Sequence, residues 1–286
     1  MKRIILTILV LVVTILACKN ETNVPKTSQN LKAMTYNIRL DAASDGENVW
    51  ANRKEFLSAQ ILFHAPDILG IQEALPNQMN DLKNALIDYK FIGVGRDGDD
   101  KGEYSAIFYN SNKLKVEQEN TFWLSNTPNQ VSKGWDAAYA RVCTYGLFTD
   151  LNSNSQIWVF NTHLDHVGKQ ARLNGMQLIL KKISEVNSSN IPVIIMGDFN
   201  VEPNSLLISN LKEVMNDAKT VSKITFGSNG TFNGFNYKAP VTRRIDYIMV
   251  SKAHTIKVKK YGVLSSAVDF KYPSDHFPVL VELMLN

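Results

Sequence analysis

Short apolar runs that end in a polar or charged residue recur along the chain from residue 31 onward. Runs of this length and composition are typical of buried β-strands. The predicted strands cover residues 31–38, 68–72, 105–109, 141–148, 157–162, 193–196 and 245–250. A further stretch, 256–263, alternates apolar and polar residues and predicts a partly exposed strand.

Apolar residues at helical spacing lie between some of these strands. The predicted helices cover residues 53–63, 79–86 and 171–183. Other strands follow one another without a helix between them, and this mixture predicts an α+β fold or a layered α/β fold with mixed sheets. No Pro-, Ser- or Gly-rich stretch divides the chain, so we expect one domain over residues 31–286.

The first 17 residues differ in character from the rest. Lys2 and Arg3 give a basic start, and residues 4–17 are almost entirely aliphatic. This run is shorter than the roughly 20 residues of a membrane-spanning helix, and it fits the charged start and apolar middle of a secretory signal. It ends in Ile15-Leu16-Ala17-Cys18, which resembles the lipobox of bacterial lipoproteins.

We therefore expect residues 1–17 to be a lipoprotein-type signal peptide, Cys18 to carry lipid, and residues 18–30 to form a polar tether. Two alternatives stay open: a cleaved signal followed by an incidental cysteine, and an uncleaved anchor. Buried acyl chains bind proteins to membranes, so the sequence predicts an exported protein of the bacterial outer membrane or cell envelope. We infer no obligate protein partner.

Charge and cysteine content narrow the classes of function. The chain has 31 basic and 27 acidic residues, and loss of Lys2 and Arg3 with the signal would leave 29 basic residues. These charges are dispersed, whereas a duplex-binding nuclease usually shows a basic footprint. A dedicated nucleic-acid enzyme is therefore not favoured. Cys143 lies in an apolar run and is expected to be buried, without a disulfide to Cys18.

Polar residues that are able to carry chemistry stand at or near the ends of the predicted strands. They are Asn37, Glu73, His163, Asp165, Asp198, Asn200, Asp246, Asp275 and His276. Strand ends gather at one edge of a sheet, so these side chains could converge although they are far apart in the sequence. Each has a structural alternative, because Asn and Asp favour turns and Glu can cap a helix. Because these side chains all suit the same kind of chemistry, a common functional site is favoured over a separate structural role for each.

These residue types suit one kind of chemistry. Carboxylate and amide oxygens are hard ligands that Mg²⁺ or Mn²⁺ prefers, and the set is too rich in oxygen for a structural zinc site. An Asp–His pair can fix one imidazole tautomer and stabilise its charged form. Neither a G-x-S-x-G elbow nor a G-x-x-x-x-G-K-[ST] loop is present in the sequence, which argues against a serine hydrolase and a P-loop enzyme.

Six short motifs in order resemble the endonuclease/exonuclease/phosphatase superfamily. They are Met34-Thr35-Tyr36-Asn37-Ile38-Arg39, Ile71-Gln72-Glu73, Asn161-Thr162-His163-Leu164, Gly197-Asp198-Phe199-Asn200, Arg244-Ile245-Asp246-Tyr247-Ile248 and Ser274-Asp275-His276-Phe277-Pro278-Val279. Each fragment is weak alone, but six in order are specific. The resemblance implies a deoxyribonuclease-like, four-layered sandwich of two stacked mixed β-sheets flanked by helices, with the site at one edge.

The resemblance also implies a role for each matching residue. Glu73 would be the principal metal ligand, helped by Asn37, and Asp275 would lie near the metal. Asp198 and Asn200 would position the attacking water and the phosphate. His276, oriented by Asp246, would stabilise the developing charge, and His163 would contact a phosphate oxygen. Whether Asp198 or His276 is the general base stays open.

Further residues near these motifs are candidates for binding the substrate. Arg141 suits a phosphate clamp, and its alternative is a surface ion pair; Asp165 and His166 could shape the leaving-group pocket. Glu103 and Tyr109 are additional candidates. Trp123 and Trp135 could stack on a sugar or base, but we expect them to be core aromatics. Four stretches resemble an exported bacterial branch of the family with no settled substrate. They are Phe122-Trp123-Leu124-Ser125, Gly134-Trp135-Asp136-Ala137-Ala138, residues 161–166 followed by Ala171-Arg172, and Gly230-Thr231-Phe232-Asn233-Gly234-Phe235.

The function expected from the sequence is hydrolysis of a phosphate ester with Mg²⁺ or Mn²⁺ as cofactor. The favoured substrate class is a small or glycan-linked phosphate, attacked by a phosphomonoesterase or a phosphodiesterase. The alternatives are an extracellular endo- or exonuclease and a sphingomyelinase-like phospholipid diesterase. The last is the least favoured, because the sequence shows no exposed-looking aromatic hairpin for insertion into a membrane.

Overall fold

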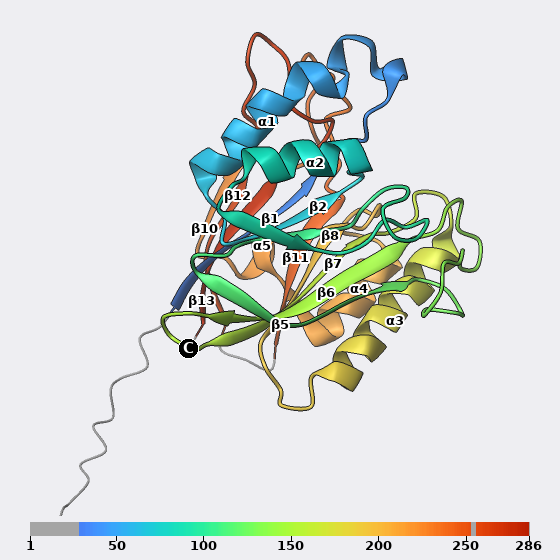
Figure 1. Ribbon diagram of the computed structural model, residues 1–286, viewed down its shortest axis with the longest axis vertical. Coiled ribbons are helices and arrows are strands. Elements are labelled where there is room, and N and C mark those ends of the chain that lie inside the picture. The colour runs from blue at the N-terminus through green and yellow to red at the C-terminus, as the bar shows by residue number, and fades with distance from the viewer. Residues whose placement is uncertain (1–28, 253–255, 286) are drawn as a thin grey trace, which may run out of the picture.

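Two β-sheets pack face to face in the computed structural model, which describes residues 29–252 and 256–285 (Figure 1). Among these residues the first sheet has seven strands, in the order β10 (Ile224–Gly227), β12 (Lys257–Val263), β13 (Val279–Leu285), β1 (Gln29–Asn37), β2 (Ile68–Gln72), β4 (Ile107–Asn110) and β3 (Tyr89–Ile92). The second has six described strands, in the order β5 (Leu114–Trp123), β6 (Val142–Asp150), β7 (Gln156–His163), β8 (Val193–Asp198), β11 (Asp246–Ser251) and β9 (Met215–Asp217).

Helices cover the outer face of each sheet (Figure 1). On the first sheet these are α1 (Trp50–His64) and α2 (Pro76–Ala85), and on the second α3 (Lys169–Val186) and α4 (Leu206–Val214). The shorter elements are η1 (Ala43–Asn48) and α5 (Ala218–Val221). Each layer boundary contains its own cluster of buried side chains, one between the sheets and one under each pair of helices. The predicted four-layered deoxyribonuclease-like sandwich of mixed sheets is confirmed.

The helices begin and end where local chemistry allows. Pro76 opens α2 at a position whose backbone N–H would have no partner in the helix. The Ser205 hydroxyl caps α4 by accepting a hydrogen bond from the Ile208 backbone N–H at 3.3 Å. In α3, the buried residues Ala171, Gly175, Met176 and Ile179 follow one another at spacings of four, one and three positions. This spacing gives the helix one apolar face, which packs on the second sheet.

A buried polar contact joins the two sheets directly behind the strand ends. Gln72 on β2 donates from Nε2 to Asn161 Oδ1 at 2.7 Å. Asn161, on β7, donates from Nδ2 to the carbonyl oxygens of Ile71 and Ala106 at 2.9 and 2.8 Å. A methyl group on Gly70 would lie only 2.7 Å from Asn161 Oδ1, so this approach requires glycine. Because unpaired amides are costly inside a protein, the contact fixes how the sheets align.

The chain enters the first sheet at the edge opposite to the predicted site. Gln29 pairs with Leu285 at one end of β1, whereas Asn37 pairs with Gln72 at the other end. The signal peptide, Cys18 and most of the predicted tether lie outside the described residues; the last two tether positions, 29 and 30, already belong to β1. No helix within the described part of the chain is long and apolar enough to cross a membrane. Cys143 is a free, buried thiol, as predicted.

Candidate active site

Strand direction explains why the predicted site residues meet at one edge. In the second sheet β7 runs parallel to β8 and places His163 beside Asp198, while β11 runs antiparallel and places Asp246 beside the same Asp198. The carboxyl ends of β7 and β8 therefore lie next to the amino end of β11. In the first sheet the same edge holds the carboxyl ends of β1 and β2 and the segment that leads into β13.

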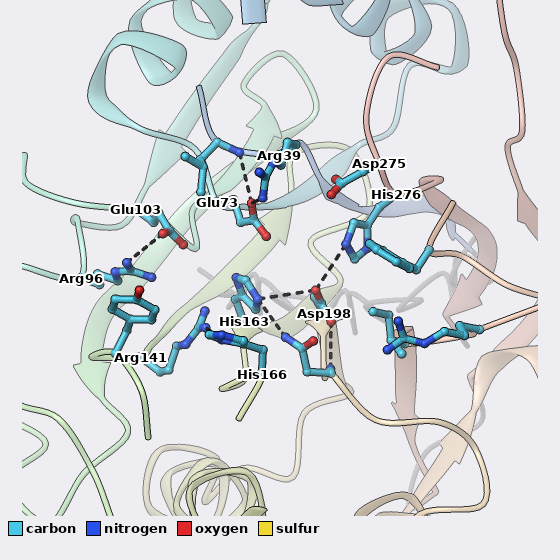
Figure 2. A pocket seen from close by; sticks show the side chains of 16 residues that line it. Arg39, Glu73, Arg96, Glu103, Arg141, His163, His166, Asp198, Asp275 and His276 are labelled. Atoms are coloured by element: carbon cyan, nitrogen blue, oxygen red, sulfur yellow. Dashed lines mark hydrogen bonds and ion pairs between the residues drawn. The ribbon is translucent and has the colours of Figure 1, made fainter. Parts of the chain in front are cut away.

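A cavity of about 590 Å³ opens at this edge (Figure 2). Its volume lies within the range of small-molecule sites. The lining residues are Arg39, Leu40, Glu73, Arg96, Glu103, Tyr139, Arg141, His163, His166, Asp198, Asn200, Phe232, Arg243, Ile245, Asp275 and His276. They come from loops on both sheets, so the two halves of the sandwich together form the pocket.

Glu73 and Asp275 are two of the three pocket carboxylates that the first sheet and its loops contribute; the third, Glu103, lies on the loop between β3 and β4. Glu73 has a left-handed backbone, with φ of 66°, which is uncommon for a residue with a side chain. Its Oε1 accepts from Asn37 Nδ2 at 2.9 Å, and its Oε2 accepts from the Leu40 N–H at 3.2 Å. Burial raises the pKa of Asp275, and the negative charge of Glu73 raises it further although His276 lowers it. A partly buried carboxylate and a buried one that repel each other form a site that a cation would stabilise.

Asn37 bridges two acidic groups. Its Nδ2 also donates to Asp198 Oδ2 at 3.1 Å, and its Oδ1 accepts from the Arg39 N–H at 3.0 Å. In this orientation the Asn37 amide nitrogen orients both carboxylates, and the amide oxygen is occupied by the hydrogen bond from the Arg39 backbone N–H. The structure thus places Asn37 behind the pocket rather than among its lining residues. A direct metal contact would require the amide to turn over.

Asp198 is the buried carboxylate at the centre of the site. The glycine before it, Gly197, has φ of 142°, and a methyl group there would lie 1.9 Å from the Thr162 carbonyl oxygen. Asp198 Oδ1 accepts from the Asn200 N–H at 2.8 Å. Burial raises the pKa of Asp198 to about 7, Asp246 raises it in the same direction, and His276 lowers it. This carboxylate can therefore exchange a proton near neutral pH.

His276 is paired with Asp246. The His276 Nδ1 lies 2.9 Å from Asp246 Oδ2, and its Nε2 points to Asp198 Oδ2 at 3.8 Å. Burial alone would lower the pKa of His276, but the charge and hydrogen bond of Asp246, with Asp198 and Asp275, raise it well above its usual value. The raised pKa favours the charged form of His276, which Asp246 holds as the predicted Asp–His pair requires.

Three of these residues form a cluster compact enough to hold an ion. Ligand atoms of Asp198, Asp246 and His276 all lie within 4.8 Å of one another. An imidazolium has no free lone pair, however, so protonated His276 is a poor metal ligand. Glu73 and Asp275 offer oxygens from a pocket wall, which is the donor set that Mg²⁺ and Mn²⁺ prefer. The residues present therefore fit a hard divalent cation best at Glu73 and Asp275.

His163 and Asn200 complete the floor of the pocket. Asn200, whose φ is 52°, places Nδ2 at 3.0 Å from both His163 Nε2 and the Leu164 carbonyl oxygen. Burial lowers the pKa of His163 well below its usual value, and Arg141 lowers it further. The two shifts have opposite directions: they favour the neutral form of His163 and the charged form of His276. The two histidines present different hydrogen-bonding groups to the same cavity.

Arg53 supports the site from beneath. Its guanidinium is buried and donates to the carbonyl oxygens of Arg39 and Leu40 at 2.7 and 3.2 Å and to that of Pro273 at 3.2 Å. One cation thus ties the loop after β1 to the loop that carries Asp275 and His276. The predicted helix over residues 53–63 contains Arg53, but nothing in its spacing indicates this role.

The Arg141 guanidinium gives one wall of the pocket a positive charge, and neighbouring side chains hold it in place. Arg141 donates from Nε to Asp165 Oδ2 at 3.3 Å, and its Nη2 lies 3.1 Å from His166 Nδ1. Asp165 is buried; its oxygens also accept from the backbone N–H groups of Ala138, Val167 and Gly168. Those hydrogen bonds lower the pKa of Asp165 despite its burial. Asp165 thus positions Arg141, which contacts His166, and both Arg141 and His166 line the pocket.

Sequence reasoning placed most of the site and missed part of it. Tyr109 lies on β4, packs edge-on against Phe148 in the core between the sheets, and does not line the pocket. Trp123 is buried and Trp135 partly buried, as expected of structural aromatics. The lining residues without a predicted role are Arg39, Leu40, Arg96, Tyr139, Phe232, Arg243 and Ile245. Arg39 and Ile245 lie within two of the six motifs, and Phe232 lies within the stretch Gly230-Thr231-Phe232-Asn233-Gly234-Phe235. That closeness is the signal that could have identified them.

Known proteins share this architecture and sequence. A mannosyl-6-phosphatase of Bacteroides thetaiotaomicron VPI-5482 is 39% identical, with a TM-score of 0.85 over 88% of this chain and 99% of that one. The uncharacterised protein L388 of Acanthamoeba polyphaga mimivirus is 31% identical over 176 residues, 57% of this chain and 63% of the viral protein. The probable RNA exonuclease NGL3 of Saccharomyces cerevisiae is 25% identical over 201 residues, 63% of this chain and 39% of the yeast protein.

The chain spans less than two-thirds of the length of the viral and yeast relatives, whereas it covers nearly all of the bacterial phosphatase. Residues 34–276 match the endonuclease/exonuclease/phosphatase family, and this range contains all six motifs up to His276. With the two stacked mixed sheets and the pocket at their common edge, the match establishes that this chain belongs to the endonuclease/exonuclease/phosphatase family.

Proposed function

We propose that the protein is a divalent-metal-dependent phosphomonoesterase that acts on phosphorylated sugars or sugar units of a glycan. The observation that supports this most directly is the convergence of Arg39, Arg141 and three histidines on one pocket beside Glu73 and Asp275. Such a pocket suits a terminal phosphate, which carries up to two negative charges on one group. The extensive likeness to a mannosyl-6-phosphatase supports the same substrate class.

The proposed cation site lies at Glu73 and Asp275. When bound there, a divalent cation supplies positive charge that stabilises the negative charge growing on the phosphoryl oxygens. Leu40 and Asn37 hold the Glu73 carboxylate through the hydrogen bonds described above, so its oxygens need little reorganisation. Arg39, held by Asp45 through two hydrogen bonds of 2.8 and 2.9 Å, adds a fixed positive charge at the same wall.

Asp198 is the favoured base for the attacking water. It is buried, it is oriented by the Asn200 N–H and the Asn37 amide, and its pKa of about 7 lies near physiological pH. A base of this strength removes a proton from water as the oxygen approaches phosphorus. Protonated His276, whose Nε2 lies 3.8 Å from Asp198 Oδ2, stabilises negative charge on the phosphate or the leaving oxygen.

Asp246→Asn tests how His276 is held. We expect kcat to fall about a hundredfold, because the amide neither fixes the tautomer nor stabilises the imidazolium. Asp246 raises the pKa of His276, so the variant imidazolium loses its proton at a lower pH. The alkaline limb of the kcat profile should therefore move to lower pH. An unchanged profile with reduced kcat would show that Asp246 acts only on the fold.

A substrate panel tests the proposed function. The purified protein with Mg²⁺ or Mn²⁺ is assayed on hexose 6-phosphates, a simple phosphodiester, and single- and double-stranded nucleic acid, with Glu73→Gln as the blank. We expect phosphate release from hexose phosphates at a kcat/KM of about 10⁴ M⁻¹s⁻¹ or more, which is ordinary for an enzyme on a suitable substrate. Diester and nucleic acid should be at least about a hundredfold poorer, which corresponds to about 2.7 kcal/mol of transition-state binding.

A nuclease is the second candidate, and one observation favours it. A second hollow, lined in part by Arg172 and Glu202, shares Asn200, Arg243 and Ile245 with the pocket. It could receive a further nucleotide of a chain, and the yeast relative is a probable RNA exonuclease. Cleavage of nucleic acid as efficiently as hexose phosphates in the panel would overturn the proposed phosphomonoesterase.

The cell-envelope location remains part of the proposal. It rests on the resemblance of residues 15–18 to a lipobox and on the basic and apolar residues before them. A membrane-held phosphatase would act on substrates outside the cytoplasm, which suits phosphorylated glycans. Lipid on Cys18 is the anchor that this setting requires.

A further inference from the structure

An ion pair forms one end of the pocket, away from Asp275 and His276 (Figure 2). Arg96 Nη2 lies 2.8 Å from Glu103 Oε1, and each side chain is only 13% exposed. The loop that carries them closes on itself, because the Arg96 N–H donates to the Glu103 carbonyl oxygen at 2.9 Å. The pair is therefore held in place by its own backbone before any ligand binds.

An aromatic rim lies beside this pair. The Arg96 guanidinium carbon is 4.8 Å from the centre of the Tyr139 ring, and the rings of Tyr139 and His166 are stacked at 5.9 Å. The Tyr139 N–H donates to Asp165 at 3.3 Å, so the residue that supports Arg141 also positions this rim. Tyr139 is 52% exposed, and it therefore remains available for contact with a ligand.

The charge of Glu103 restricts what this end of the pocket can bind. A carboxylate only accepts hydrogen bonds, and it repels a phosphate at short range. Burial and the charge of Glu73 raise the pKa of Glu103, whereas Arg96 and Arg141 lower it. A ligand group beside it must therefore bring hydrogen-bond donors and no negative charge. Hydroxyl groups meet this condition, and the next phosphate of a nucleic acid does not.

We propose that Arg96 and Glu103, with Tyr139 at the rim, bind the hydroxyl groups of a sugar whose phosphate lies at Glu73, Asp275 and His276. This inference rests on the proposed function and names the residues that recognise the sugar part of the substrate. Of two neighbouring hydroxyls, one donates to Glu103 and the other accepts from Arg96. The apolar C–H groups of the ring contact Tyr139, which is a common way to combine apolar and polar recognition.

Arg141 belongs to both parts of this arrangement. It lines the pocket with Arg96, Glu103 and His163, and the same four residues border a small adjoining cavity. Its positive charge is thus available to the phosphate close to the point where the sugar begins. Glu103 and Arg96 are in this account specificity-determining residues, because they contact the part of the substrate that does not react.

The test compares Glu103→Gln with Lys101→Gln, an exposed residue of the same loop whose side chain does not line the pocket. For each protein, kcat/KM is measured on a hexose 6-phosphate, its monodeoxy analogues and phenyl phosphate, which has no hydroxyls. Loss of one charged hydrogen bond to a substrate hydroxyl is worth about 10- to 100-fold in discrimination. We therefore expect Glu103→Gln to lower the ratio of hexose phosphate to phenyl phosphate about thirtyfold, and Lys101→Gln to leave it unchanged.

The deoxy analogues provide the second readout. With the analogue that lacks the hydroxyl bound by Glu103, the wild type and Glu103→Gln should have nearly equal kcat/KM. If Glu103→Gln lowers kcat/KM equally on the hexose and phenyl esters, or leaves their ratio within twofold, the sugar subsite is overturned although the phosphomonoesterase stands. If the wild type releases no phosphate from any hexose ester yet cleaves a diester or nucleic acid, the proposed function fails and the subsite fails with it.

Discussion

Glu73→Gln is expected to lower kcat about a thousandfold or more while the protein stays folded. The substitution keeps the shape of the side chain but removes the charge that the proposed cation requires. It also weakens the orientation of Asn37 and the Leu40 backbone, which both donate to this carboxylate. The measurement is kcat on a hexose 6-phosphate at saturating Mg²⁺, together with the thermal unfolding temperature.

Glu55→Gln is the matched control for this variant. Glu55 lies on α1, is exposed and carries the same change of charge, so it should retain full activity. A folded Glu73→Gln protein with more than about a tenth of normal kcat would be incompatible with transition-state stabilisation at this position. Recovery of its activity at very high Mg²⁺ would instead show weakened binding of the cation, which still assigns Glu73 to the metal site.

Removal of divalent metal is expected to reduce turnover to less than about a thousandth of its normal rate, and Mg²⁺ or Mn²⁺ should restore it. Without a cation, Glu73 and Asp275 face an incoming phosphate with two negative charges. Electrostatic repulsion between these two carboxylates and the phosphate opposes both binding and reaction. The assay uses the protein before and after chelation, with circular dichroism to follow the fold.

A readout independent of activity accompanies this experiment. A cation that binds only the folded protein raises the unfolding temperature. Mg²⁺ should therefore stabilise the wild type, and it should stabilise Glu73→Gln much less. Full activity in excess chelator would remove the cation from the mechanism. Equal stabilisation of both proteins would place the cation elsewhere, for instance at the Asp198, Asp246 and His276 cluster.

The layered fold could be predicted because its central strands are continuous apolar runs. β2, β6 and β8 are buried along their whole length, and their sequences show it. β5 escaped prediction because residues 115–120 are mostly polar and lie at the edge of the sheet. All four residues of β10 are exposed, so burial left no pattern there either. Edge strands depend on pairing with a neighbour, which a local pattern does not record.

The site was predictable to the extent that its residues follow central strands. His163, Asp198 and Asp246 were found because they stand at the ends of predicted strands, and the strand register brings them side by side. Arg96 and Tyr139 lie on loops whose path depends on backbone contacts within the loop and on Asp165. Tyr109 was a candidate because it lies in the same stretch as Glu103, residues 102–109, but the alternation of β4 turns its side chain into the core between the sheets.

The direction of β1 has a consequence for how the protein would work when immobilised. Both described ends of the chain, at Gln29 and Leu285, leave from the edge remote from the pocket, and β1 separates that edge from Asn37 by about 26 Å. A protein attached to a surface through its N-terminal segment can thus present its pocket to the solution on the side away from that surface. It would meet molecules that arrive by diffusion from the surrounding medium. An enzyme that consumes the lipids of its own bilayer needs the opposite orientation.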